Sequence, residues 1–334
     1  MTSAARRWRL LLAALALLVS ASTPSNALEK VTFVMSWAPD ARWASEFLAK
    51  ERGYFAQEGL EVNFVHQRGS LASLQQVGAG AAEFGSPDAG DVIFAREKGV
   101  PIKSIELPGR NTGIAFMSLK ETNITKPEDL VGKKVGVQRA SATWVGFQAL
   151  MAKYGVDVEK LEKIEASFGL EVLLLKKVDI RPVMIFNEYV LAVHKGIPVN
   201  VMWLPDYGLN LPGKTLSTNE KTLKERPKIV QAFVNATLRG QEEALRDRKA
   251  AIDALMKNVP DLERAYQEKV WDMLVEKIWG AKDATTDKPL GWNDPGLFKT
   301  AVEILTQYGG LKKAPSMDEV FDNRFVDAYH RSKR

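Results

Sequence analysis

A segment near the N-terminus constrains the fold most strongly, because its pattern changes from strand to helix and back. Residues 31–36 are rich in β-branched and aromatic side chains, which predicts a strand. Residues 44–57 carry apolar side chains at helical spacing, and Gly53 interrupts this helix near its end. Residues 60–65 alternate between apolar and polar side chains, like a second strand. This order predicts a βαβ unit and therefore an α/β fold.

The loop that follows the first predicted strand, residues 37–43, is the first candidate for a ligand site. In open α/β sheets, ligands bind beyond the carboxyl ends of the strands. The loop offers two indoles, a carboxylate and a guanidinium, from Trp37, Trp43, Asp40 and Arg42. Indole faces stack on planar rings, so this set suits a flat small molecule with a polar edge. The alternatives are that the indoles belong to the core and that Asp40 caps its own helix.

A second α/β unit begins near residue 114, and the chain is long enough for two domains. In this unit, strand patterns alternate with helix patterns at residues 134–138, 183–186 and 199–204. From residue 222 onward the pattern is nearly all helical, and residues 316–319 match a capping box before the last helix. The two units are similar in kind but share no visible sequence repeat.

Glu188 follows one of these predicted strands, and we expect it to be the second carboxylate that contacts a ligand, after Asp40. A carboxylate can accept a hydrogen bond from the amine of an aminopyrimidine and pair with its protonated ring nitrogen. Such charge-assisted hydrogen bonds are the stronger kind. The alternative is an acid that caps its own helix, although Asn187 beside Glu188 can serve as the cap instead.

Four further side chains lie at predicted helix N-termini, where exposed backbone N–H groups attract anions and carbonyl oxygens. They are Ser70, Asp88, Ser141 and Thr143. We predict each of them as a candidate ligand contact, with plain helix capping as the alternative.

Residues 1–27 have the pattern of an export signal, with a basic start followed by an uncharged apolar run at residues 10–19. This run is too short to span a bilayer as a helix, and small residues before the end predict cleavage after Ala27. An uncleaved membrane anchor is the alternative, and the pair Arg6-Arg7 leaves Sec and twin-arginine export open. The net charge of +5 includes three arginines of this leader, which leaves +2 for the remainder and no basic stripe for nucleic acid.

Several classes of enzyme and cofactor are excluded by the residues present. The chain has no cysteine, so thiol nucleophiles, iron–sulfur clusters and Cys-ligated zinc are excluded, and disulfides are absent. His66, His194 and His330 have no spacing typical of a metal site. The sequence has no nucleophile elbow and no Walker loop. We therefore predict no cofactor and no enzymatic activity.

Five segments resemble the periplasmic substrate-binding proteins for sulfonates, taurine, nitrate and thiamine-pyrimidine precursors. They are residues 37–40, 50–62, 132–137, 184–188 and 206–208. The block at residues 50–62 is typical of the family as a whole, and the last two segments are most similar to the pyrimidine-precursor branch. The resemblance spans roughly residues 30–250.

This resemblance implies a type II periplasmic-binding-protein fold, with two three-layer α/β lobes around a central cleft and two crossings between them. Residues 28–113 and 212–334 would form the first lobe, and residues 114–211 the second. Trp37 and Asp40 would contact the ligand from the first lobe, and Asn187, Glu188 and Tyr207 from the second. The implied role is a periplasmic, monomeric binding protein that delivers a small molecule to the permease and ATPase subunits of an ABC importer.

The same resemblance leaves the ligand open, because this chain departs from the pyrimidine binders in its first loop. Those proteins continue the loop with Asn-His-Thr-like residues, where this chain has Ala41, Arg42 and Trp43. Arg42 is able to recognise a carboxylate or a phosphate instead. We expect a thiamine-type pyrimidine first, a riboflavin-like ring second, and a sulfonate or aromatic acid third. A pyrimidine synthase on this fold would need a cysteine-rich motif that is absent here, and a sensory role is a further alternative.

Overall fold

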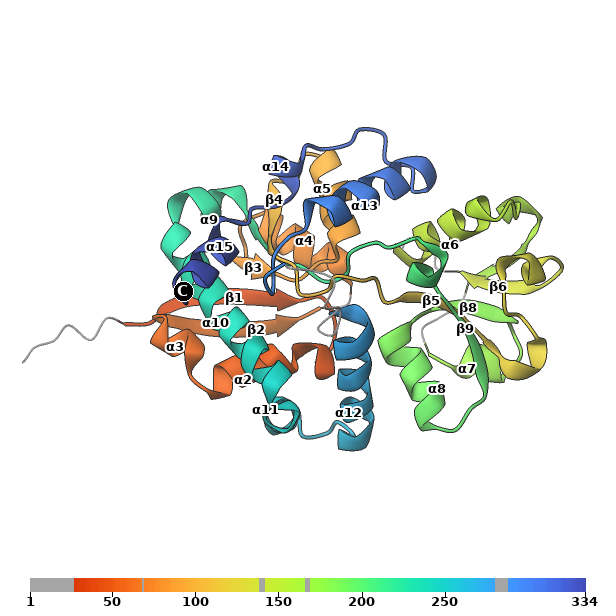
Figure 1. The fold of residues 1–334 in the computed structure, drawn as a ribbon, viewed down its shortest axis with the longest axis horizontal. Coiled ribbons are helices and arrows are strands. Elements are labelled where there is room, and N and C mark those ends of the chain that lie inside the picture. The colour runs from red at the N-terminus through yellow and green to blue at the C-terminus, as the bar shows by residue number, and fades with distance from the viewer. Residues whose placement is uncertain (1–26, 68, 138–141, 166–168, 280–287) are drawn as a thin grey trace, which may run out of the picture.

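The computed structural model describes residues 27–67, 69–137, 142–165, 169–279 and 288–334. Its strands form two five-stranded sheets that lie in two lobes (Figure 1). The first sheet has the order β2 (Leu60–His66), β1 (Glu29–Met35), β3 (Phe84–Gly85), β10 (Leu216–Asn219) and β4 (Ile102–Glu106). The second has the order β7 (Glu162–Glu165), β6 (Lys134–Val137), β8 (Ile180–Met184), β5 (Ile114–Leu119) and β9 (Val199–Trp203).

The predicted βαβ unit is confirmed. Strand β1 pairs in parallel with β2 along its whole length, with Phe33 opposite Phe64. The intervening helix is divided into α2 (Ala44–Glu51) and α3 (Tyr54–Gln57). Gly53 lies at the division with a φ of +68°, a left-handed conformation that glycine adopts without strain.

Helices cover both faces of each sheet, which gives each lobe three layers (Figure 1). Alternate residues of β1 enter different cores, with Phe33 in one and Val34 in the other. The first core lies under α2, α3, α7 (Glu171–Leu174), α8 (Val190–His194), α10 (Pro227–Arg246), α11 (Arg248–Asn258) and α12 (Arg264–Met273). The second lies under α4 (Ser70–Gly78), α5 (Ala89–Glu97), α6 (Ala142–Lys153), α13 (Pro295–Tyr308) and α14 (Met317–Val320). Two further helices, α9 (Glu220–Glu225) and α15 (Arg324–Arg331), complete the first lobe.

The chain crosses between the sheets after β4 and returns after β9, as the predicted fold requires. The two crossing segments run side by side, and the N–H of Gly213 donates to the carbonyl of Gly109 at 2.9 Å. A Cβ at Gly213 would lie only 2.9 Å from the backbone oxygen of Asn111, so this close approach requires glycine. The lobe boundaries at residues 113/114 and 211/212 stay a prediction, and we propose them from the position of these crossings.

Three local predictions have different outcomes. The capping box at Ser316 is confirmed as the start of α14, but this helix ends at Val320, and the last helix is the separate α15. The strand predicted for residues 183–186 is wrong at its end, because β8 stops at Met184 and residues 185–189 form a π-helix. Strand β10 was not predicted, because its four residues are held by antiparallel pairing with β3 and β4, which are distant in sequence.

Candidate functional site

The loop after β1 folds back on itself through Asp40 and Arg42. Asp40 caps the short 3-10 helix η1 (Ala41–Trp43), and its Oδ1 accepts a hydrogen bond from the backbone N–H of Arg42 at 2.9 Å. The guanidinium of Arg42 donates to the same carboxylate, from Nε at 2.9 and 3.0 Å and from Nη2 at 2.7 Å. Asp40 therefore caps its own helix, as the alternative interpretation has it, and its charge is already paired.

Arg42 also reaches the second lobe. Its guanidinium carbon lies 5.1 Å from the centroid of the Phe186 ring, within the range of a cation–π contact. Only 16% of the Arg42 side chain is exposed. Burial lowers the pKa of Arg42, but Asp40, together with the charges of Asp88 and Glu188, outweighs burial and raises this pKa above its usual value. Charged groups of both lobes thus lie close enough to influence one another.

The second lobe contributes the π-helix η5 (Ile185–Tyr189), which directly follows β8. π-Helices are rare and are frequent at functional sites. Within it, Glu188 is buried, its Oε2 accepts from the backbone N–H of Met184 at 3.0 Å, and its Oε1 lies 4.0 Å from Nη2 of Arg181. Glu188, rather than Asn187, therefore caps the segment that carries it, and its carboxylate has internal partners.

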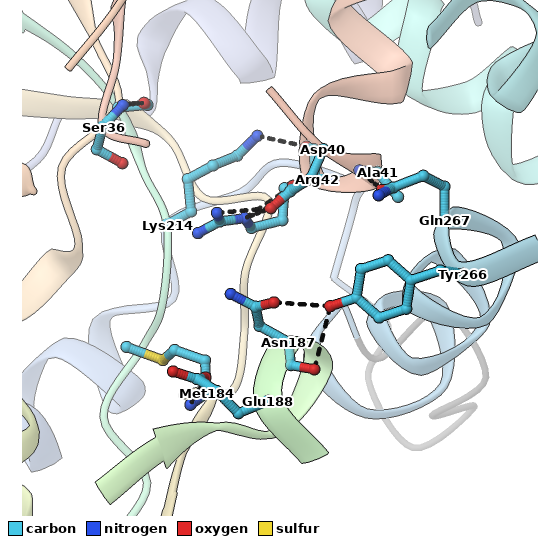
Figure 2. Close-up of polar contacts among 11 residues, drawn as sticks. Ser36, Asp40, Ala41, Arg42, Met184, Asn187, Glu188, Lys214, Tyr266 and Gln267 are labelled. Atoms are coloured by element: carbon cyan, nitrogen blue, oxygen red, sulfur yellow. Dashed lines mark hydrogen bonds and ion pairs between the residues drawn. The ribbon is translucent and has the colours of Figure 1, made fainter. Parts of the chain in front are cut away.

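Asn187 instead connects the two lobes (Figure 2). The hydroxyl of Tyr266 on α12 lies 2.7 Å from Oδ1 of Asn187 and 3.2 Å from its backbone oxygen. The next residue on α12, Gln267, accepts a hydrogen bond from the backbone N–H of Ala41 at 2.8 Å. Helix α12 thus binds the loop of the first lobe through Gln267 and the π-helix of the second lobe through Tyr266. The sequence pattern did not point to either residue of α12.

Lys214, on the second crossing, is another residue that the sequence pattern did not indicate. Its Nζ donates to Oε1 of Glu46 at 2.6 Å and to the backbone oxygen of Arg42 at 3.2 Å. The same ammonium lies 4.3 Å from the centroid of a Trp43 ring that is fully buried and meets Phe33 edge-on. The prediction that Trp43 faces a ligand is therefore corrected, because this indole packs in the core beneath the loop.

Asp88 differs from Asp40 and Glu188, the other two carboxylates predicted as ligand contacts. Among the residues that the structure describes, no donor is hydrogen-bonded to its side chain, although Asp88 occupies the cap position of α5. Burial raises the pKa of Asp88 to about 7, the charge of Asp91 adds to this rise, and Arg42 and Lys214 oppose it. Asp88 can therefore accept or donate a hydrogen bond near neutral pH, and it is the acid with open hydrogen-bonding capacity here.

The remaining predicted contacts are placed as follows. Ser70 is the first residue of α4 and Gly69 is its cap, so the alternative that Ser70 caps this helix is wrong. Its Oγ instead accepts from the backbone N–H that follows β3, at Asp88. Trp37 is half-buried in the first loop, and Thr143 is buried at the start of α6. Ser141 lies outside the described residues.

Tyr207 lies at the end of α6 that is opposite to Thr143. Its ring packs against Tyr154 with a centroid distance of 5.6 Å, and its hydroxyl donates to the backbone oxygen of Thr125 at 3.4 Å. Helix α6 has 12 residues, and a helix of this length extends about 18 Å. We therefore remove Tyr207 from the candidate site, because the turn after β9 directs this side chain to the far end of the helix.

Histidines contribute one more contact between the lobes. Nε2 of His194, on α8, lies 2.7 Å from Oε1 of Glu263, just before α12. His66 is exposed, and Nε2 of His330 lies 2.9 Å from the backbone oxygen of Leu290. In the described part of the chain, no group of three or more His, Asp or Glu side chains is placed to hold a metal ion. No helix within these residues combines the length and the hydropathy needed to cross a membrane.

The two lobes and the double crossing between them are the features of the periplasmic-binding-protein fold. Residues 41–251 match the family described as NMT1/THI5 like, and the chain belongs to this family. The resemblance found in the sequence is thereby confirmed.

Two relatives that align over most of their length are named as binding proteins, and a third, 19% identical over 90% of this chain and 94% of its own, is named as a pyrimidine phosphate synthase. The chain is 25% identical to the riboflavin-binding protein RibY of Chloroflexus aurantiacus, over 90% of this chain and 86% of the relative. It is 26% identical to the formylaminopyrimidine-binding protein of Halalkalibacterium halodurans, over 92% of this chain and 96% of that protein. The aliphatic sulphonate binding protein SsuA of Escherichia coli superposes with a TM-score of 0.68 at 14% identity, covering 87% of this chain and 91% of SsuA. This last likeness concerns the fold alone.

Proposed function

We propose that this protein is the exported solute-binding component of an ABC importer and that it captures a small planar nitrogen heterocycle between its lobes. Family membership and two full-length relatives named for riboflavin and formylaminopyrimidine support this ligand class. A thiamine-precursor pyrimidine and a riboflavin-like ring are the two candidates within it. A sulfonate is the alternative, since proteins of this fold include SsuA.

The observation that carries the proposal is the position of Arg42. Its flat guanidinium is paired with the carboxylate of Asp40 from its own lobe and lies over the Phe186 ring of the other lobe. A carboxylate and an aromatic ring brought together from two lobes suit a flat polar group. We propose that Trp37, Asp88 and Asn187 complete the contacts around the ligand.

The proposed cycle of capture rests on the connections between the lobes. Two crossing segments form a hinge, and hinge closure around a ligand is common in two-domain binding proteins. Helix α12 joins the lobes through Tyr266 and Glu263, so it would open and re-form these contacts as ligand enters. The protein would act as a monomer in the periplasm after cleavage of residues 1–27, and would deliver its ligand to a permease and its ATPase.

A thermal-shift screen of the exported chain, residues 28–334, tests the proposal. The compounds are 4-amino-5-hydroxymethyl-2-methylpyrimidine, riboflavin and taurine. A ligand at about 100 times its Kd stabilises a folded protein by about 2.7 kcal/mol, which raises Tm measurably. We expect at least one heterocycle to raise Tm. Recovery of the unchanged heterocycle after incubation with the protein would support a binding role over an enzymatic one. Stabilisation by taurine with no effect of either heterocycle would contradict the proposal.

A further inference from the structure

Both carboxylates that the sequence offers to an aminopyrimidine already have partners inside the protein. Asp40 accepts three hydrogen bonds from the Arg42 guanidinium and one from its backbone N–H. Glu188 accepts from the backbone N–H of Met184 and faces Arg181. An aminopyrimidine binds strongly when its amine and ring nitrogen meet a free carboxylate. Neither Asp40 nor Glu188 is free in this sense.

The Arg42 guanidinium makes the contacts with Asp40 that such a ligand would need. This group is a planar cation that donates two parallel sets of N–H bonds to a carboxylate and presents its face to an aromatic ring. A protonated aminopyrimidine would use the same carboxylate and the same ring in the same way. Within the described residues, the remaining terminal nitrogen, Nη1, donates no hydrogen bond, so it is the donor that Arg42 has left to offer.

The charges around this donor are balanced. Three ion pairs lie at the junction, Arg42 with Asp40, Lys214 with Glu46, and Arg181 with Glu188. Asp88 and Asp91 add further acidic groups, and among the described residues the cations that act on Asp88 are Arg42 and Lys214, which already have partners. Among the residues that the structure describes, the junction therefore has no excess of positive charge to compensate a sulfonate or a carboxylate ligand. A neutral acceptor, such as a ring carbonyl, can accept from Nη1 without this penalty.

We propose that Arg42 determines the specificity of the site, and that it selects a neutral heterocycle with carbonyl oxygens at its edge, of the pyrimidinedione type, over an aminopyrimidine. This inference rests on the proposed function and names the ligand class within it. Arg42 pairs with the carboxylate of Asp40, so this carboxylate cannot bind a cationic ring. In its place, Nη1 of Arg42 provides an N–H donor for the ligand.

Titration calorimetry on the exported chain compares riboflavin, which carries a pyrimidinedione edge, with 4-amino-5-hydroxymethyl-2-methylpyrimidine. We expect the wild type to bind riboflavin more tightly. Arg42→Ala should lose about tenfold to a hundredfold in affinity for riboflavin and gain affinity for the aminopyrimidine, because Asp40 becomes free. Arg42→Gln, which keeps an N–H donor but no charge, should retain part of the riboflavin affinity. Denaturant unfolding of each variant shows whether it is folded.

The matched control is Arg324→Ala. Arg324 makes the same contacts with Asp322 on the surface of the first lobe, far from Phe186 in sequence, and its loss should leave both affinities unchanged. Tighter binding of the aminopyrimidine by the wild type, or an unchanged ratio of the two affinities in Arg42→Ala, would overturn the inference and leave the proposed function standing. If taurine binds and neither heterocycle does, both the inference about Arg42 and the proposed function are rejected.

Discussion

Two Asp-x-Arg segments of this chain have nearly the same local geometry and very different surroundings. In each, the aspartate accepts from the backbone N–H two residues later, at 2.9 Å for Asp40 and 3.0 Å for Asp322. In each, Nε and Nη2 of the arginine donate to both carboxylate oxygens. Yet 16% of the Arg42 side chain is exposed, compared with 73% for Arg324.

The aromatic partner separates the two segments further. Arg324 lies 5.4 Å from the ring of Phe325, its neighbour in the chain. Arg42 lies 5.1 Å from the ring of Phe186, which belongs to the other lobe. Short-range sequence therefore determines the folded-back motif, whereas tertiary structure determines whether the motif connects two lobes or remains on a surface.

The largest expected effect is on stability. Arg42→Ala leaves Asp40 without its cation in a mostly buried position, and should lower the free energy of unfolding by about 2–3 kcal/mol. Arg324→Ala removes an exposed side chain and should cost less than about 0.5 kcal/mol. Urea unfolding of both variants at pH 7 measures the difference. Equal losses would show that burial does not distinguish the two motifs.

A buried carboxyl group that is hydrogen-bonded to a hydroxyl, and not to a cation, extends this contrast. Glu106 is 2% exposed and accepts from the hydroxyl of Thr237 at 2.8 Å. Burial raises its pKa from 4.5 to about 8. Because the folded state holds this proton more tightly than the unfolded state, the stability from protonation is full below about pH 4.5 and is lost as pH rises toward 8.

Glu106→Gln cannot titrate, so its stability relative to the wild type should rise between pH 6 and pH 8, by about 2 kcal/mol. Denaturant unfolding at both pH values provides the measurement. Glu61→Gln, on an exposed position of β2, is the control and should show the same difference from wild type at both values. A Glu106→Gln effect that does not change with pH would contradict the assignment of a buried, protonated carboxyl.

The smallest expected effect concerns the contact between lobes. Tyr266→Phe removes one hydroxyl bond to Asn187 across the junction, worth about 1 kcal/mol, and should shift the balance of closed and open forms about fivefold toward open. Tyr54→Phe removes a hydroxyl bond to Glu243 within the first lobe and is the matched control. Small-angle scattering should give a larger radius of gyration for Tyr266→Phe alone. The same radius of gyration for the wild type, Tyr266→Phe and Tyr54→Phe would show that the bond between Tyr266 and Asn187 does not hold the lobes together.

Much of the fold could be predicted because its signals are local. The strand, the break at Gly53 and the second strand are encoded within about 35 residues, and a capping box is encoded within four. Strand β10 escaped prediction because its stability comes from pairing with β4, more than a hundred residues away in the chain. The π-helix after β8 also escaped, because its first residues continue the apolar pattern of the strand.

The site could be predicted less well than the fold. The loop of Asp40 and Arg42 was found, but its partners Lys214 and Gln267 are separated from it by well over a hundred residues and carry no local signal. Whether a carboxylate is free also depends on tertiary contacts, which is why Asp40 and Glu188 were predicted as ligand contacts and are paired internally.

Native mass spectrometry of residues 28–334, purified without denaturation, is the most direct test of ligand capture by this site. We expect one flat, carbonyl-bearing nitrogen heterocycle bound to each chain, retained by Arg324→Ala and lost from Arg42→Ala. A bound sulfonate in the wild type, or the same heterocycle retained by Arg42→Ala, would contradict this expectation.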